Sequence, residues 1–240
     1  MITDLKKLWK QAFGDSDAFL DTFFSVAYCP ARSQYLTQDG RLAAMLYWFD
    51  CQCRDKKIAY IYAVATDEAY QNRGLCRQLM EKTHALLQKQ GYAGAILVPG
   101  SAGLFALYEK LGYRTCSTVT VTDCAAGAPV SLRPVTAAEY AALRRTLLPE
   151  GGVVQEDAAL ALLEATSAFY AGDGFVLTAS AENGTAHIQE LLGHADPAGV
   201  VAALDAATGT VRTPGKSTPF AMYYPFTDDP APAYFGLALD

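Results

Sequence analysis

The segment Gln71-Asn72-Arg73-Gly74-Leu75-Cys76-Arg77 decides the fold, because it joins an apolar run, Ile58 to Thr66, to a helical pattern that continues to about Gln90. A strand, a turn that needs glycine and a helix that begins at that glycine direct free backbone N–H groups and the positive helix end at one point. Diphosphate is the usual ligand of such a point. The sequence therefore predicts an anion-binding loop at Gly74.

The elements around this loop predict an α/β first half. Helical spacing of apolar residues, turn signals such as Asp39-Gly40 and breaks at glycine or proline indicate the remaining elements. We expect helices at Asp4–Phe13, Asp17 to about Tyr28 and about Gly103–Leu111, and strands at Arg32–Gln38, Arg41–Phe49, Ala93–Val98 and Tyr113–Val121. The unit from Ile58 to Val98 should form a right-handed parallel crossover.

A small, nearly uncharged segment, Asp123 to Ser131, predicts a linker between two domains, 1–125 and 126–240. In the second we expect a strand at Val130–Arg133, helices at Thr136–Leu148, about Gln155–Tyr170 and from Pro197 to Gly209, and a hairpin at Asn183-Gly184. This order partly repeats the first half and suggests a tandem fold. A further strand candidate, Pro219 to Phe226, favours core or interdomain packing, with a substrate-lining role as the alternative.

Composition narrows the classes of function. The 240 residues carry a net charge of −6, which argues against nucleic acid as a partner because phosphate contacts need clustered Lys and Arg. Apolar runs are too short for a membrane span and no signal peptide is evident, so we expect a cytoplasmic protein. The six scattered cysteines predict free thiols. We expect no metal site: Cys51 and Cys53 should point to opposite faces of a strand, and no second Cys/His pair has ligand spacing.

Two motifs together resemble the GCN5-related N-acetyltransferase (GNAT) superfamily. The stretch from Val64-Ala65-Thr66 through Gln71–Cys76 is similar to its acetyl-CoA motif, in which Arg or Gln, two residues, Gly, one residue, then Gly or Ala open the pyrophosphate-binding helix. Leu107–Tyr113 is similar to the family's Phe-Tyr-x-Lys-x-Gly-Phe segment. The resemblance spans roughly Ile58 to Tyr113. It implies a mixed sheet flanked by helices, followed by a smaller, degenerate GNAT-like half.

The resemblance also implies site residues. The backbone of Val64, Ala65 and Thr66 would hold the pantetheine arm and the thioester oxygen of acetyl-CoA. The diphosphate would be held by Gln71, Asn72, Arg73, Gly74, Leu75, Cys76 and Arg77. Tyr108 is the candidate general acid for the departing thiolate, with a core tyrosine as the alternative. Ser101 stands where the family has an Asn, and Cys76 where it has Gly or Ala.

The general base is unassigned by sequence. Tyr60 and Tyr62 occupy the strand on which some relatives place a glutamate. A water chain, Glu68, a residue of the second half, or the C-terminal carboxylate at Asp240 are the alternatives. The first helix begins almost at Met1, so the strand that normally precedes it in the family is absent.

The second half shows no coenzyme loop, because Gly193-His194-Ala195-Asp196-Pro197 follows its hairpin. We expect it to cover the open sheet edge of the first half and to shape the acceptor pocket. The leading hypothesis is an acetyl-CoA-dependent N-acetyltransferase acting on a small-molecule or peptide amine in a ternary complex. The alternative is a non-catalytic acyl-CoA-binding or assembly module. A homodimer is left open.

Overall fold

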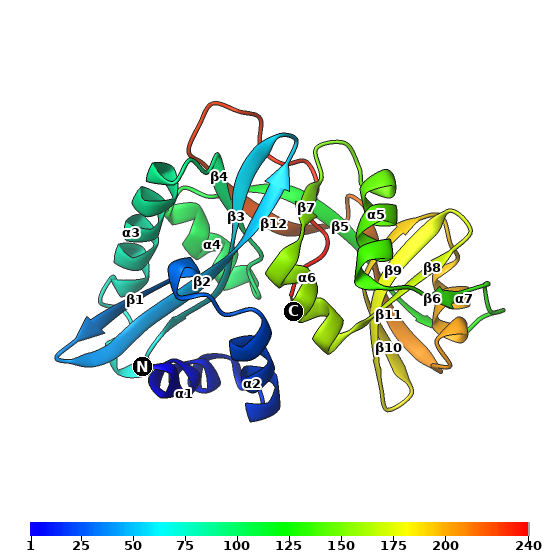
Figure 1. Cartoon of the computed structure of the whole chain (residues 1–240), viewed down its shortest axis with the longest axis horizontal. Helices are drawn as coiled ribbons and strands as arrows, with labels where there is room; N and C mark the ends of the chain where they lie inside the picture. Colours follow the sequence, from blue (N-terminus) through cyan, green and yellow to red (C-terminus); the bar gives the residue numbers. More distant parts are fainter. Residues whose placement is uncertain (240) are drawn as a thin grey trace.

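The computed structural model describes residues 1–239, in which seven helices pack around one continuous sheet (Figure 1). The helices are α1 (Ile2–Phe13), α2 (Asp17–Val26), α3 (Leu75–Lys89), α4 (Ala102–Lys110), α5 (Ala137–Leu147), α6 (Asp157–Thr166) and α7 (Pro197–Ala203). The strands of the first half are β1 (Ser33–Gln38), β2 (Arg41–Cys53), β3 (Lys56–Thr66), β4 (Gly94–Leu97) and β5 (Arg114–Ala125). Those that follow are β6 (Arg133–Pro134), β7 (Val153–Gln155), β8 (Ala168–Gly172), β9 (Phe175–Glu182), β10 (Thr185–Gly193), β11 (Thr208–Pro214) and β12 (Thr218–Pro225).

Local sequence signals account for most helix starts. Ser16, Ser101 and Thr136 are N-caps whose side-chain oxygens accept from the backbone N–H three residues later, at the starts of α2, α4 and α5. The parallel pairing of β3 with β4, joined by α3, confirms that the predicted crossover is parallel. The Asp39-Gly40 and Asn183-Gly184 hairpins are confirmed as well.

The sheet order shows how the two halves are connected. It runs β1-β2-β3-β4-β12-β5-β11-β10-β9-β8-β6, with β7 beside β2. The last strand, β12, therefore lies inside the first half's sheet, antiparallel to both β4 and β5. The long strand β5 pairs with β12 along its first part and with β11 along the rest. Rather than covering an edge, the second half thus completes the sheet of the first, and the predicted domain boundary at 125/126 falls within a shared sheet.

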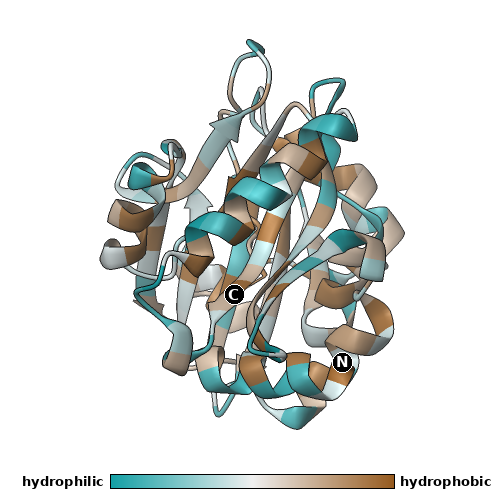
Figure 2. Cartoon of the chain, turned by 90° about the vertical axis from the view of Figure 1, so that its left-hand side faces the viewer, coloured by the Kyte–Doolittle hydropathy of each residue, from teal (hydrophilic) through white to brown (hydrophobic). Residues whose placement is uncertain are grey.

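Both faces of the sheet are covered. In β2, Met45 and Tyr47 pack on one face with α1 and α2, whereas Leu46 and Trp48 pack on the other with α3 and α4. The first of these cores continues into α5 and α6, so one hydrophobic cluster spans the two halves. A third cluster lies between the second half's sheet and α7. In the view of Figure 2, hydrophilic residues gather on the outward surfaces of the helices and in the loops.

A buried ion pair anchors the C-terminal segment. Arg144 on α5 donates two hydrogen bonds to the Glu190 carboxylate on β10, from Nε at 2.6 Å and from Nη2 at 3.0 Å. The Tyr234 hydroxyl donates to the same carboxylate at 3.0 Å. Farther along, the backbone N–H and C=O of Phe235 both bond the Ser117 hydroxyl of β5. The segment 234–239 is thereby threaded between the two halves, and its last described residues lie beside α6 (Figure 1).

Several expectations about elements were wrong. The helix predicted from Pro197 to Gly209 ends at Ala203, and Gly209 lies in β11. The strand predicted at Val130–Arg133 is limited to Arg133–Pro134. The helix predicted to reach Tyr170 ends at Thr166, and Ala168–Gly172 forms strand β8, paired with β9. Cys51 and Cys53 lie on the same face of β2 in one core cluster, because residues two apart in a strand share a face. All six cysteines are free thiols. No group of three or more metal-ligating side chains occurs within residues 1–239, and none of the helices there is long and apolar enough to cross a membrane.

Candidate functional site

The site begins where two parallel strands separate. β3 and β4 pair only from Ile58 opposite Gly94 to Tyr60 opposite Ile96. Beyond this point β4 ends and leads into Pro99 and Gly100, whereas β3 continues to Thr66. The edge of β3 that faces β4 is therefore left open along its second half.

A bulge shapes this open part of β3. In the pairing with β2, Met45 lies opposite Ala65 and Tyr47 opposite Tyr62, so Ala63 and Val64 share one position. Ala63 has a φ of 49°, in the left-handed region that costs a residue with a Cβ roughly 1–2 kcal/mol. Both residues line a cavity. Strain of this kind persists only where surrounding structure enforces it, and it marks functional sites.

The glycine loop lies at the continuation of the same strand. Gly74 is the N-cap residue of α3, with a φ of 78°. A Cβ there would meet no atom within 4 Å, so the backbone conformation, and not space, calls for glycine. No side chain caps α3, and the N–H groups of its first turn have no intrahelical partner. The N-terminus of α3 therefore presents free donors and the positive helix end, as the sequence predicted.

Three polar side chains of the loop contact neighbouring residues. The Arg73 guanidinium lies 5.4 Å from the centre of the Tyr70 ring. Arg77 donates a 3.3 Å hydrogen bond to the carbonyl of Lys110 at the end of α4, which ties the two helices together. Gln71 donates to the carbonyl of Thr66 at 3.3 Å. An anion at this loop would therefore be held mainly by backbone N–H groups, with Arg73 and Arg77 beside them.

Tyr108 lies on α4, beside the open edge of β3. Its side chain is 6% exposed, lines the cavity and packs edge-on against the Tyr113 ring. Burial raises the pKa of its hydroxyl well above the ordinary value, with a smaller contribution from nearby Cys76. The group therefore stays protonated at neutral pH. Ser101, the N-cap of α4, also lines the cavity.

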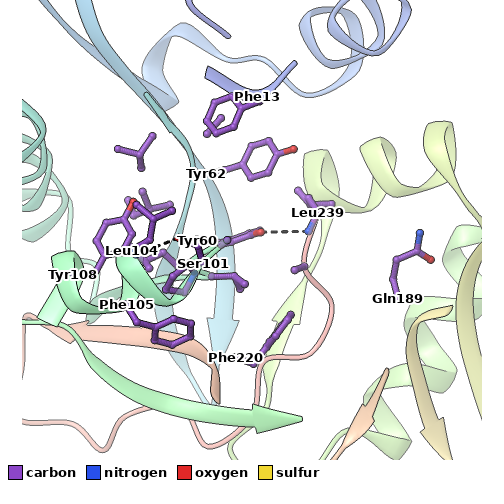
Figure 3. A pocket seen from close by; sticks show the side chains of 18 of the residues that line it. Phe13, Tyr60, Tyr62, Ser101, Leu104, Phe105, Tyr108, Gln189, Phe220 and Leu239 are labelled. Atoms are coloured by element: carbon purple, nitrogen blue, oxygen red, sulfur yellow. Dashed lines mark hydrogen bonds between the residues drawn. The ribbon is translucent and has the colours of Figure 1, made fainter. Parts of the chain in front are cut away.

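A cavity of about 1300 Å³ extends from this strand opening to the second half. Its walls come from α1 and α2, from β3 and the start of α4, and across from them from α6, β12 and the C-terminal segment. In Figure 3, Phe13 and Tyr62 lie on one side of this space, Tyr108 and Phe105 on another, and Leu239 and Phe220 opposite them. The strand Pro219–Phe226 was expected to pack in the core or line substrate, and β12 does both: Met222 is buried in a core cluster and Phe220 lines the cavity.

The predicted site residues fall into two groups. Val64, Ser101 and Tyr108 line the cavity. The remaining ones follow Val64 along the chain, past the end of that cavity: Ala65, Thr66, Gln71, Asn72, Arg73, Gly74, Leu75, Cys76 and Arg77. Sequence reasoning missed Ala63, which carries no glycine to mark its left-handed conformation, and it missed the cavity-lining residues of α1, α6 and the C-terminal segment.

The candidate general bases differ in whether they line the cavity. Glu68 lies in a short 3-10 turn, Glu68–Tyr70, and is not among the described residues that line the cavity. Asp240 lies outside the described residues. The carboxylates that do line the cavity, among residues 1–239, are Asp15 and Glu109. From the second half come the polar side chains of Ser167, Ser180 and Gln189.

Comparison with known proteins agrees with this geometry. The family model described as an acetyltransferase (GNAT) domain matches residues 1–116. This match covers just under half of the chain and assigns its first half to the GNAT acetyltransferase domain family. A sequence search of curated proteins finds no significant match.

Solved structures of GNAT proteins extend the similarity over both halves. A GCN5-related N-acetyltransferase from Anabaena variabilis has a TM-score of 0.70 and 16% identity, over 92% of this chain and 69% of that one. One from Kribbella flavida has a TM-score of 0.67 and 17% identity, over 92% and 68%. A tandem GNAT protein from the clavulanic acid biosynthesis pathway has a TM-score of 0.56 and 11% identity, over 95% and 96%. At these identities the likeness is one of fold, and it includes a tandem GNAT architecture.

Proposed function

We propose that this GNAT protein transfers an acetyl group from acetyl-CoA to an amine by direct attack in a ternary complex. The observation that carries the proposal is the continuity of the site. The glycine loop, the strained open edge of β3 and Tyr108 follow one another along one side, and the cavity that starts there reaches the second half. Donor and acceptor can therefore be bound in the same cavity at the same time.

The first half contains the groups to which we assign the binding of acetyl-CoA. The free N–H groups at the start of α3, with Arg73 and Arg77 nearby, suit the diphosphate of coenzyme A. The open edge of β3 suits the amide groups of the pantetheine arm. At the bulge, the backbone of Ala63 and Val64 is released from regular pairing with β2, and we assign it the polarisation of the thioester carbonyl.

Tyr108 serves the leaving group. The neutral amine nitrogen attacks the thioester carbon and the carbon–sulfur bond breaks. The proton that the nitrogen loses passes to solvent water in the cavity, and solvent returns one proton to the Tyr108 oxygen after the transfer. The Tyr108 hydroxyl hydrogen-bonds the departing sulfur and supplies the proton that converts the thiolate to free coenzyme A. Its raised pKa keeps the hydroxyl protonated at neutral pH, so it is available to hydrogen-bond the departing sulfur.

Acetyl-CoA turnover with a broad panel of amines, followed as free thiol release, tests this function. We expect release above the hydrolysis background with at least one amine, and a sequential kinetic pattern when both substrates are varied. Coenzyme alone should raise the melting temperature, because it binds only the folded chain.

The same experiment separates catalysis from simple binding. A coenzyme-dependent rise in melting temperature without thiol release from any amine would favour a non-catalytic acyl-CoA-binding module. No rise in melting temperature at saturating coenzyme would contradict both functions.

A further inference from the structure

The cavity is larger than the donor needs. Its volume, about 1300 Å³, exceeds the 300–1000 Å³ typical of a site for one small ligand. The pantetheine arm would take the part beside β3 and α4. The remainder lies between α1 and α2 of the first half and α6, β12 and the C-terminal segment of the second. The acceptor therefore has a compartment of its own.

Aromatic and aliphatic side chains form most of this compartment. Trp9, Phe13 and Phe19 line it from the first half. Leu162, Phe220 and, from the C-terminal segment, Leu239 line it from the second half. Phe220 and Leu239 are labelled in Figure 3. Such walls bind ligands mainly by removing apolar surface from water, and burying one phenyl-sized group contributes about 1.5–3 kcal/mol. An acceptor that is mostly polar would gain little from them.

Phe13 is a part of this apolar wall that is exposed to solvent. It is the last residue of α1, its side chain is 46% exposed, and it lines the cavity. A single exposed apolar residue needs no explanation. Leu104, on α4, is also exposed and lines the same cavity on the side of the pantetheine arm, whereas Phe13 lies on the side left for the acceptor. An apolar acceptor would cover Phe13.

The charges at the cavity select against acidic acceptors. The charged side chains that line it among residues 1–239 are two carboxylates, Asp15 and Glu109. Asp15 accepts a 2.7 Å hydrogen bond from the Trp9 indole N–H, which holds this carboxylate at the aromatic wall. Aromatic faces and a carboxylate together attract a protonated amine and repel a carboxylate-bearing one.

We infer that the acceptor is a hydrophobic primary amine with an aromatic or bulky apolar body and no carboxylate, seated between Phe13 of the first half and Phe220 of the second. This inference rests on the proposed acetyltransferase function.

Paired substrates test it. At saturating acetyl-CoA, kcat/KM for thiol release is compared between 2-phenylethylamine, phenylalanine (the same body with a carboxylate) and ethanolamine (the same aminoethyl group with a hydroxyl in place of the ring). We expect 2-phenylethylamine to exceed each of the others by at least about tenfold, the lower end of what one buried ring contributes.

A matched pair of variants locates the effect. Phe13→Ala should raise KM for 2-phenylethylamine several-fold and leave KM for acetyl-CoA unchanged. Ile2→Ala removes an equally exposed side chain, 48% against 46%, from the same helix but outside the cavity, and should change neither.

Fluorescence gives a reading that does not depend on turnover. The chain has two tryptophans, and only Trp9 lines the cavity, so in a Trp48→Phe variant Trp9 alone reports amine binding.

Turnover of phenylalanine or ethanolamine at equal or higher kcat/KM would overturn the inference and leave acetyl transfer intact. If no amine supports thiol release, the proposed function falls, and the Trp9 titration then supports the inferred ligand class or, if phenylalanine binds as tightly, overturns it.

Discussion

The backbone N–H of Leu239 donates a 3.3 Å hydrogen bond to the Tyr60 hydroxyl, across 179 residues of sequence. The contact brings the end of the described chain to the strand opening at which β3 and β4 separate. Both residues line the cavity, so the C-terminal segment forms part of its wall.

Deletion of residues 238–240 should therefore impair acceptor use more than folding. The anchors at Tyr234 and Phe235 remain, so we expect the melting temperature to fall by only a few degrees. The acceptor KM should rise, or kcat fall, by about tenfold, the effect of losing one apolar contact and one hydrogen bond. Wild-type kinetics in the truncated protein would show that the segment has no part in the site.

Replacement of Tyr108 by Phe should lower kcat by about 100-fold or more, the usual range for loss of a positioned proton donor. Coenzyme affinity should be unchanged, because the ring stays. Tyr113→Phe is the matched control. It removes the neighbouring hydroxyl, whose 2.8 Å bond is to His84 Nε2, from a residue outside the cavity lining. Equal kcat values for the wild type and Tyr108→Phe would remove this hydroxyl from the mechanism.

Gly74→Ala should weaken coenzyme binding through the backbone alone. The φ of 78° costs alanine about 1–2 kcal/mol, and no neighbouring atom obstructs its Cβ. Gly174→Ala is the control, because Gly174 has a φ of 73°, equally open surroundings and a position in the turn between β8 and β9. Both variants should lose similar stability in urea unfolding. Only Gly74→Ala should raise the Kd for coenzyme A, and equal Kd values in the two variants would contradict a diphosphate role for this loop.

His84 should make the protein less stable in mild acid. Its ring is buried, stacks on Tyr224 and shares a hydrogen bond with the Tyr113 hydroxyl. Burial lowers its pKa from 6.5 to about 4. Between these values the unfolded chain binds the proton and the folded one does not, so the free energy of unfolding decreases as pH falls from 6.5 towards 4. The loss is roughly 3 kcal/mol at most.

The measurement for this prediction is urea unfolding at pH 7.5 and pH 5, with His84→Gln as the comparison. The variant should lose less stability between the two pH values than the wild type. An NMR titration that places the His84 pKa at or above 6.5 would contradict the assignment.

Sequence patterns predicted the parts of the fold that local chemistry determines. The apolar run before Gly74 and the helical spacing after it specified the parallel crossover and the glycine turn at the start of α3. The pairing of β12 with β4 and β5 was not predictable, since periodicity identifies a strand but not a partner more than a hundred residues away. The same limit hid the cavity, whose far wall comes from α6 and the C-terminal segment. Ala63 was missed because an alanine carries no signal for a bulge.

The position of β12 also has a consequence for synthesis of the chain. While the protein is being translated, β4 and β5 emerge well before the strand that separates them in the finished sheet. Their facing edges keep unpaired N–H and C=O groups until β12 has left the ribosome. The first half of the molecule therefore cannot complete its native sheet before β12 is synthesised, and its folding is tied to synthesis of the second half.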